Sequence, residues 1–449
     1  NNTYAVNMDV AGGRHRYVYG GGENCVINGD IAVWVYDTLV FSIFSGAGSS
    51  DVNGNINVNL DLPSYEGSKM SGNFYGGAVP VVGTTGTVGR NSNIVGDINM
   101  TLKSAADAPG AYEGLIFGGS RAWGSVANVD GDINLSVTNI VHTDNLKLIA
   151  AGKGNSAWIV GGSQIANNGS AAGTGLITGT VNMTIGVSSL SNVVGGGQAQ
   201  GAGAALTVDA VNLSINGATI ANGIYGAGYA AQGGSVTVGS NLITISASAD
   251  AATTIQGYVY AAGYVVGSGS INVINDSTVA FTGDGNYLTI GTVNGLGKGN
   301  CSVGGMTVAS FNDFTGEFSG TLVNFDAVGF GGNTVGVTMA NAYESSVWSF
   351  NVIGRTATDM FSSDPDSFNL VGDERAINLI IDTKNGFSFD LIDVTGEELD
   401  GVTVNLLDAN NNSLGSFAFG GSLVVDKGTI TLEDVDGILS VNYNKGTIA

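Results

Sequence analysis

The chain has 449 residues, of which 43% are hydrophobic, which is ample for a buried core and argues against disorder. Its 73 glycines and only 4 prolines exclude collagen and proline-rich linkers and predict many tight turns between short strands. The 37 acidic and 14 basic residues give a net charge of −23, which argues against a nucleic-acid partner, because clustered Lys and Arg bind a phosphate backbone.

No apolar run reaches the ~18 residues that a membrane-spanning helix needs, so no membrane span is predicted. Cys25 and Cys301 give neither a disulfide framework nor a metal-ligand spacing. A composition low in Cys and rich in Ser, Thr, Asn and Gly favours an exported bacterial surface protein. A start at Asn1, without Met or a signal peptide, fits a processed product and equally a fragment.

Residues 1–16 are predicted to form an N-terminal strand ahead of the repeats. Tyr4, Val6, Met8 and Val10 share one face of this strand, and a Gly-Gly pair separates it from the next segment. Such a strand is suited to pairing with the free sheet edge of a neighbouring copy. These four residues are therefore candidate assembly residues.

A first repeated motif places apolar or aromatic residues directly before a glycine-rich corner. Consecutive glycines predict a positive φ and a tight corner, and they let neighbouring strands approach with no Cβ between them. A phosphate-binding loop is disfavoured, because the motif recurs and lacks the Lys-Ser/Thr ending. The occurrences are 17–22, 43–46, 74–77, 116–119, 159–162, 193–197, 224–228 and 259–263.

A second motif alternates with the first and has a strict period of two. Ile98, Met100 and Leu102 share one face while Asn99 and Thr101 share the other, which predicts a half-buried strand with its Asn residues pointing outward. The occurrences are 29–35, 54–60, 96–102, 131–137, 179–185, 209–215 and 269–273.

Stacking is needed to bury the apolar faces of these strands, because two short strands cannot do so alone. The spacing is 30 residues in the middle of the chain, and the longer spacings before it predict inserted arms. We therefore expect an all-β fold in which residues 17–345 form a β-solenoid (β-helix) of about eight to nine irregular coils. Its outward ladder is predicted to consist of Asn57, Asn99, Asn134, Asn182, Asn212 and Asn272.

Residues 346–449 are more acidic than the rest and lose the repeat, so a C-terminal all-β domain or cap is expected. A hairpin loop is predicted at 408–413. The predicted strands are 347–353, 377–382, 387–392, 402–407, 414–419, 429–432 and 438–443.

The glycine corners and the Gly-Asp-Ile-Asn-x-Thr/Ser strands, such as 96–101, resemble the passenger regions of bacterial autotransporter adhesins and other Gly- and Asn-rich surface β-helix proteins. The resemblance covers residues 17–345 and implies export by a Gram-negative bacterium, with a role in adhesion, aggregation or fibres. Such proteins usually end in a membrane β-barrel with a terminal aromatic residue, whereas this chain ends at Ala449. Either the barrel was removed or the protein is a free secreted subunit.

Catalytic, cofactor and metal residues are not assigned. Asp30, Asp97 and Asp132 occupy one turn position, where Asp ordinarily hydrogen-bonds its own backbone, and His15 and His142 are isolated. The alternative is a calcium ion held by oxygen ligands of the loop 408–412 or of the acids at 434 and 436. The Gly-Gly-x-Gly-x-Asp nonapeptide that is typical of calcium-binding β-rolls is missing, so no metal site is predicted. Sequons at four ladder Asn residues follow from the strand pattern without glycosylation.

The sequence thus predicts a secreted extracellular or cell-surface structural protein that is not an enzyme. It is expected to be a self-assembling filament subunit or an adhesin, with itself as head-to-tail partner and host or matrix glycans as further partners. The alternative is a polysaccharide-binding or polysaccharide-cleaving β-helix protein. Cys25 and Cys301 are too far apart along a solenoid to join, so each is expected to be buried and free or bonded to another subunit.

Overall fold

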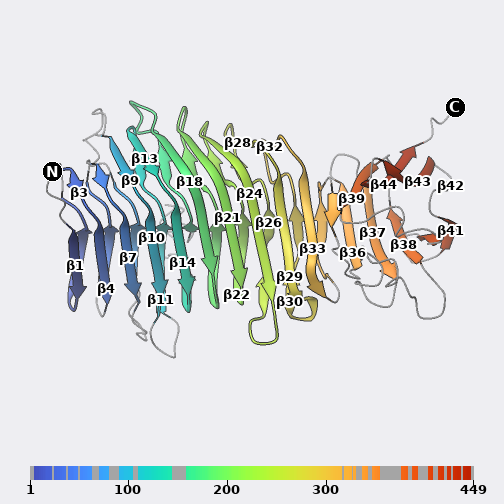
Figure 1. Ribbon diagram of the computed structural model, residues 1–449, viewed down its shortest axis with the longest axis horizontal. Coiled ribbons are helices and arrows are strands. Elements are labelled where there is room, and N and C mark those ends of the chain that lie inside the picture. Colours follow the sequence, from blue (N-terminus) through green and yellow to red (C-terminus); the bar gives the residue numbers. More distant parts are fainter. Residues whose placement is uncertain are drawn as a thin grey trace. The chain divides into compact units, whose positions relative to one another are not determined.

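The structure, a computed structural model, is built almost entirely from strands and contains long parallel sheets (Figure 1). It describes residues 5–22, 25–36, 39–48, 51–62, 70–79, 91–104, 110–143, 158–315, 318–325 and 327–329, and beyond these the nine strands from β36 to β44. The expected all-β class is confirmed, and the parallel sheets are compatible with stacked coils. The segments 63–69, 80–90, 105–109 and 144–157, on which the predicted arms fall, lie outside the described residues.

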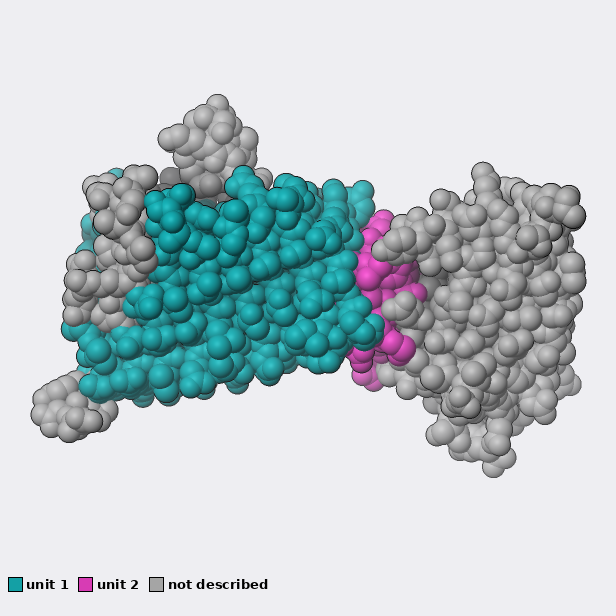
Figure 2. All heavy atoms as spheres, turned by 90° about the horizontal axis from the view of Figure 1, so that it is seen from above, with its two compact units in different colours: residues 1–243, 254–275, 297–305 teal, residues 244–253, 276–296, 306–449 magenta. Residues whose placement is uncertain are grey.

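The chain divides into two compact units (Figure 2). Unit 1 comprises Asn1–Ile243, Thr254–Asn275 and Gly297–Gly305, and unit 2 comprises Thr244–Thr253, Asp276–Leu296 and Met306–Ala449. Strands β24 (Ser235–Ala247) and β25 (Thr253–Ile255) contain residues of both units.

Unit 1 contains strands of three sheets. The first sheet holds β1 (Val6–Ala11), β3 (Ile27–Asn28), β4 (Ile31–Tyr36), β6 (Val52–Asn53), β7 (Ile56–Asp61), β9 (Ser92–Val95), β10 (Ile98–Lys103), β13 (Val126–Asp130), β14 (Ile133–Thr138), β18 (Thr174–Ile185), β21 (Ala205–Asn216), β24 (Ser235–Ala247), β28 (Ser270–Val273) and β32 (Cys301–Val303). The second holds β2 (Arg14–Tyr19), β5 (Leu39–Phe44), β8 (Met70–Tyr75), β11 (Gly110–Phe117), β15 (Ile140–Thr143), β16 (Trp158–Val160), β19 (Ser188–Val194), β22 (Ala218–Tyr225), β25 (Thr253–Ile255) and β26 (Tyr258–Tyr260). The third holds β12 (Arg121–Trp123), β17 (Gln164–Ala166), β20 (Gly197–Gln200), β23 (Gly228–Ala231) and β27 (Tyr264–Val266).

The chain passes through the three sheets in turn, and each passage through all three forms one circuit. From β18 it passes to β19 in the second sheet and β20 in the third, and it returns to the first sheet as β21, which pairs in parallel with β18. The strands β1, β4, β7, β10 and β14 also pair in parallel and lie side by side in chain order in Figure 1. Equivalent residues of successive circuits therefore stack directly above one another.

The period of two in the second motif correctly predicts which side chains form the core. Ile98, Met100 and Leu102 are at most 1% exposed, while Asn99 and Thr101 between them are half-buried. The same holds for the strands that pair with β10, so each apolar column is continuous through the stack. Burial of these columns is the main stabilising term, at about 25 cal/mol for each Å² of apolar surface removed from water.

The corner glycines serve close approach rather than a positive φ, which corrects one of the two roles predicted for them. Among the described corner glycines only Gly263 has a positive φ, at 109°. A Cβ added to Gly162 would overlap the carbonyl of Gly196 in the next circuit, and the backbone hydrogen bonds continue through the bend, as from Gly161 N to Val194 O. Glycine is required because neighbouring backbones meet where a side chain would stand.

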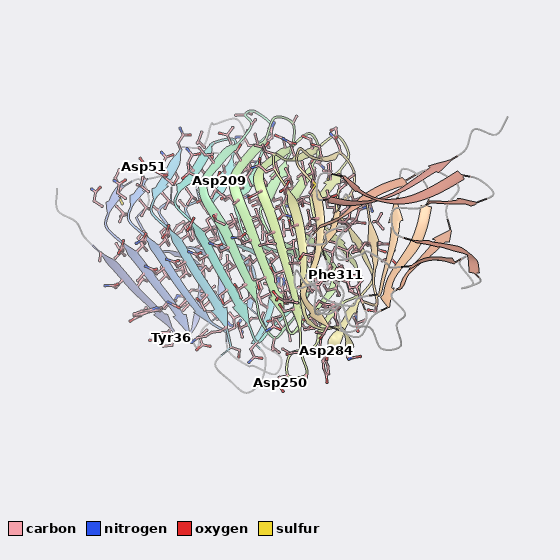
Figure 3. All side chains as sticks on the ribbon, turned by 45° about the vertical axis from the view of Figure 1, so that its right-hand side comes forward. Tyr36, Asp51, Asp209, Asp250, Asp284 and Phe311 are labelled. Atoms are coloured by element: carbon pink, nitrogen blue, oxygen red, sulfur yellow. The ribbon has the colours of Figure 1, made fainter. Side chains whose placement is uncertain are left out.

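Unit 2 contains further parallel pairs and then a set of antiparallel pairs. β29 pairs in parallel with β33. The rings of Phe281, Phe311 and Phe318 lie within 5.1 Å of one another in its core, with Phe281 stacked on Phe311 and Phe318 edge-on to Phe311 (Phe311 is labelled in Figure 3). Antiparallel pairing begins between β36 and β37. The elements are β29 (Ser277–Asp284), the 3₁₀ helix η1 (Gly285–Tyr287), β30 (Leu288–Ile290), β31 (Thr292–Asn294), β33 (Thr307–Thr315), β34 (Thr321–Val323), β35 (Ala327–Gly329), β36 (Gly336–Asn341), β37 (Ser346–Ile353), β38 (Ala376–Asp382), β39 (Phe387–Ile392), β40 (Thr403–Leu407), β41 (Ser413–Ala418), β42 (Ser422–Val425), β43 (Gly428–Val435) and β44 (Ile438–Lys445).

The strands predicted after residue 345 coincide with seven of these elements to within a few residues. The antiparallel pairing of β40 with β41 confirms the predicted hairpin, whose loop 408–412 lies outside the described residues. β42 was not predicted, because Ser422–Val425 is short and stands directly after a glycine pair.

Candidate functional surfaces

Five of the six predicted ladder residues form one continuous chain of amide hydrogen bonds on the outer face of the first sheet. From the second member onward, each Nδ2 donates to the Oδ1 of the equivalent Asn in the preceding circuit at 2.9–3.1 Å, and the side chains are half-buried or exposed. The residues are Asn57, Asn99, Asn134, Asn182 and Asn212. The amides are thus engaged with one another along the stack, as expected for a structural face.

Asn272 does not belong to that ladder. It pairs with Thr237 in the first half of β24 and accepts a hydrogen bond from Ser302 Oγ at 2.9 Å, so it lies on a neighbouring column. Asn241 stands one residue short of the 30-residue period after Asn212 and is buried, with its Nδ2 donating to Ala261 O. Asn272 was placed in the ladder because the motif at 269–273 has the same local pattern, whereas its strand pairs with residues 235–238 at the start of β24.

The aspartates before the second motif do not bond their own backbone, which corrects the sequence prediction. Asp97 Oδ1 accepts from the backbone amide of Asp132, and Asp132 Oδ1 accepts from that of Thr180, at 2.9 and 2.7 Å. The same relay runs earlier from Asp30 to Asn55 and from Asn55 to Asp97. These side chains therefore join one circuit to the next.

The predicted assembly strand is the outermost rung of its own first sheet. β1 pairs in parallel with β4, with Val6 opposite Ile31 and Met8 opposite Val33. Val6 and Met8 are half-buried, whereas Ile31 and Val33 are fully buried. Val10 is buried, and Tyr4 lies outside the described residues. The core is thus less covered at this end than one rung further in.

The two cysteines are both free, in agreement with the expectation that they do not join. Cys25 is exposed, so the expected alternative of a buried free thiol does not hold for it, and a bond to another subunit stays a prediction. Cys301 in β32 is partly buried, and its Sγ lies 3.4 Å from Lys298 O. Burial raises the pKa of the Cys301 thiol to about 12, although the backbone contact at Lys298 opposes the shift.

A row of aromatic and apolar side chains runs along the second sheet beside the glycine corners. Its members occupy the last strand position in successive circuits and, within the row, the rings of Tyr75 and Phe117 stack at 5.1 Å with an interplanar angle of 4°. We call it the aromatic row; its buried members are Phe44, Tyr75, Phe117, Val160, Val194, Tyr225 and Tyr260. The sequence motif predicted the positions but gave no sign that these residues pack together as a buried cluster of their own.

The third sheet packs its first outer column against this row. Arg121, Gln164, Gln198, Tyr229 and Tyr264 stand in register in β12, β17, β20, β23 and β27. Tyr75 Oη donates to Gln164 Oε1 at 2.8 Å, and Gln164 Nε2 donates to Gln198 Oε1 at 3.1 Å. No sequence pattern singled out this column, because its strands are only three or four residues long.

Other candidate groups have structural partners. His15 Nε2 lies 3.1 Å from Gly12 O, and buried His142 lies 2.7 Å from Gly114 O and stacks on Tyr112. Within the described residues, no group of three or more His, Cys, Asp or Glu is placed to hold a metal ion, and no helix is long and apolar enough to cross a membrane. The positions considered for calcium, which are the loop 408–412 and the acids at 434 and 436, lie outside the part of the chain whose side chains are described.

No family model matches the chain, and neither a curated protein nor a solved structure matches it.

Proposed function

We propose that the protein is an extracellular β-solenoid whose function is structural, and that it acts as a subunit that adds to other copies end to end. Export to the surface of a Gram-negative bacterium, as a filament subunit or adhesin, is part of this proposal. The glycine- and asparagine-rich composition and the resemblance of residues 17–345 to adhesin passengers support the location. The ladders support the structural role, because their polar groups bond the next circuit.

The observation that carries the assembly proposal is the terminal rung formed by β1, β2 and β3. β1 pairs with β4, β2 with β5 and β3 with β6, and in Figure 1 β1 is the outermost strand of its sheet. Val6 N donates to Asp30 O, so the amides of alternate residues Asn7 and Asp9 face away from β4. A parallel strand of a second copy would continue the same ladder.

The apolar groups of this rung support the same partner. Val6, Met8 and Ile27 are half-buried, and Tyr17 and Tyr19 are 48% and 38% exposed. Tyr19 stacks on Phe44 at 5.0 Å and so begins the aromatic row. A further circuit would cover these side chains as the second circuit covers the first, and the contact of unlike ends would not close on itself.

The proposal is tested by sedimentation velocity over a range of protein concentrations, followed by electron microscopy. We expect mass to increase with concentration and filaments to form. Asp9→Pro removes one outward amide without removing a bond to β4 and should abolish the increase. Asp9→Ser removes the same carboxylate but keeps the amide, and it should assemble like the wild type. A monodisperse monomer at every concentration would overturn the proposal.

A further inference from the structure

The third sheet of unit 1 differs in charge from the first. Its five strands contain no Asp or Glu, and Arg121 is their single charged residue. The eight carboxylates whose side chains are described in unit 1 lie instead in strands of the first sheet, as Asp209 does, or directly before such a strand, as Asp51 does before β6 (Figure 3). The eight are Asp9, Asp30, Asp51, Asp61, Asp97, Asp130, Asp132 and Asp209. A chain of net charge −23 therefore has one sheet free of acid.

Aromatic rings, most of them half-buried or exposed, gather on this sheet without carboxylates and on the adjoining strands of the second sheet. Trp158 lies edge-on to Tyr229 at 4.8 Å, and Tyr229 lies edge-on to Tyr264 at 5.8 Å. Tyr264 stacks on Tyr260 at 6.0 Å, and Tyr260 stacks on Tyr258, which is 52% exposed, at 5.5 Å. The rings thus form one connected surface across several circuits.

Neutral hydrogen-bonding groups accompany the rings. Half-buried Gln164 continues the column of Tyr229 and Tyr264 through buried Gln198, to which its Nε2 donates, and Gln200 lies half-buried at the end of β20. Burial and the neighbouring Tyr264 raise the pKa of Tyr229, so its hydroxyl stays protonated and uncharged at physiological pH. Rings with amide and phenol groups beside them suit a ligand that has both apolar faces and hydroxyl groups.

We infer that this surface, made of Trp158, Gln164, Gln200, Tyr229, Tyr258 and Tyr264, binds an extended neutral polysaccharide. The described strands of this sheet carry no carboxylate, and the cations Arg121 and Lys298 lie over aromatic rings. Successive circuits place rings or amide groups at a spacing of about 4.8 Å, along which an extended polymer can lie. Nucleic acid does not fit, because these two cations along the column are already engaged with the rings. The inference is independent of end-to-end assembly.

Affinity electrophoresis tests the inference, with native gels that contain hydroxyethylcellulose, dextran, mannan or soluble starch, and polygalacturonate as the acidic comparison. At least one neutral polysaccharide should retard the protein more than polygalacturonate does. The double variant Trp158→Ala with Tyr264→Ala should weaken polysaccharide binding about tenfold. The double variant Trp158→Phe with Tyr264→Phe keeps an aromatic ring at both positions and should retain binding. Tyr258→Ala changes an exposed ring and tests the surface even if the alanine pair fails to fold.

The matched control is Trp34→Ala with Tyr36→Ala. These rings are 47% and 45% exposed on β4 of the first sheet, and their loss should leave retardation unchanged. Absence of retardation in every neutral gel, retardation by polygalacturonate alone, or equal loss in the control pair and in Tyr258→Ala would each overturn the inference.

Discussion

Asp132 accepts a hydrogen bond from the backbone amide of Thr180 at 2.7 Å, although 48 residues separate the two in the chain. The carboxylate stands at the start of β14 and the amide belongs to β18, the next strand of the first sheet. The bond therefore holds the register of two circuits at their turn, where β18 changes its pairing partner from β13, which ends opposite Ile177, to β14, which begins opposite Val181. The need to bind a backbone amide of the next circuit explains why Asp or Asn recurs at the turn before the second motif.

Replacing Asp132 with alanine should lower the free energy of unfolding by roughly 1–2 kcal/mol, because the partly buried Thr180 amide loses its acceptor. Asp132→Asn keeps an acceptor oxygen, as Asn55 does in an earlier circuit, and should remain close to the wild type. Urea unfolding monitored by circular dichroism measures both. Equal loss in the two variants would show that the charge, and not the hydrogen bond, matters.

The sequence predicts the strands and their faces well, because the period of two reports directly which side chains enter the core. Ile98 and Asn99 are placed correctly for that reason. Contacts between circuits could not be predicted in the same way. The partner of Asp132 depends on the register of a strand 48 residues away, and Gly162 is explained only by the carbonyl of Gly196 in the next circuit. The third sheet was missed because its strands are too short for a period to show.

The Asn ladder predicts a difference between its middle and its end. Asn134 donates to Asn99 and accepts from Asn182, whereas the one ladder bond of Asn212 is its donation to Asn182. We expect Asn134→Ala to lower the free energy of unfolding by about 1–2 kcal/mol and Asn212→Ala by about half as much. Thermal and urea unfolding of the two variants provide the test, and equal effects would contradict cooperation along the ladder.

The corner glycines should tolerate no side chain where two backbones meet. In Gly162→Ala the new Cβ would overlap the carbonyl of Gly196, so the circuits must separate, at a cost of about 2–3 kcal/mol in the free energy of unfolding. Gly186→Ala is the matched control, because its Cβ would meet only the side chain of Thr138, with the nearest atom at 3.0 Å. Denaturant midpoints compare the two, and similar values would contradict the role of close approach.

Partial burial of the Cys301 thiol predicts that it reacts slowly with alkylating reagents and that the protein loses stability at alkaline pH. Its pKa is raised by burial from 9.0 to about 12 in the folded protein, so the reactive thiolate is scarce. Iodoacetamide at about pH 8 should label exposed Cys25 well before Cys301, and labelling of Cys301 should become fast only in urea. Peptide mass spectrometry identifies the labelled residue. Equal labelling rates in the folded protein would contradict the burial.

The same shift has a defined sign for stability. Below pH 9.0 the thiol is protonated in both states, so its contribution is fully present; between 9.0 and about 12 only the unfolded chain loses the proton, and stability falls as pH rises. Burial also raises the pKa of the Tyr75 and Tyr225 phenols, which adds to the decline. Urea midpoints should therefore fall above pH 9, and the fall should be smaller in Cys301→Ser, which has no thiol to ionise. A midpoint that stays constant to pH 11 in the wild type would contradict this account, because the unfolded chain would then gain nothing from ionisation.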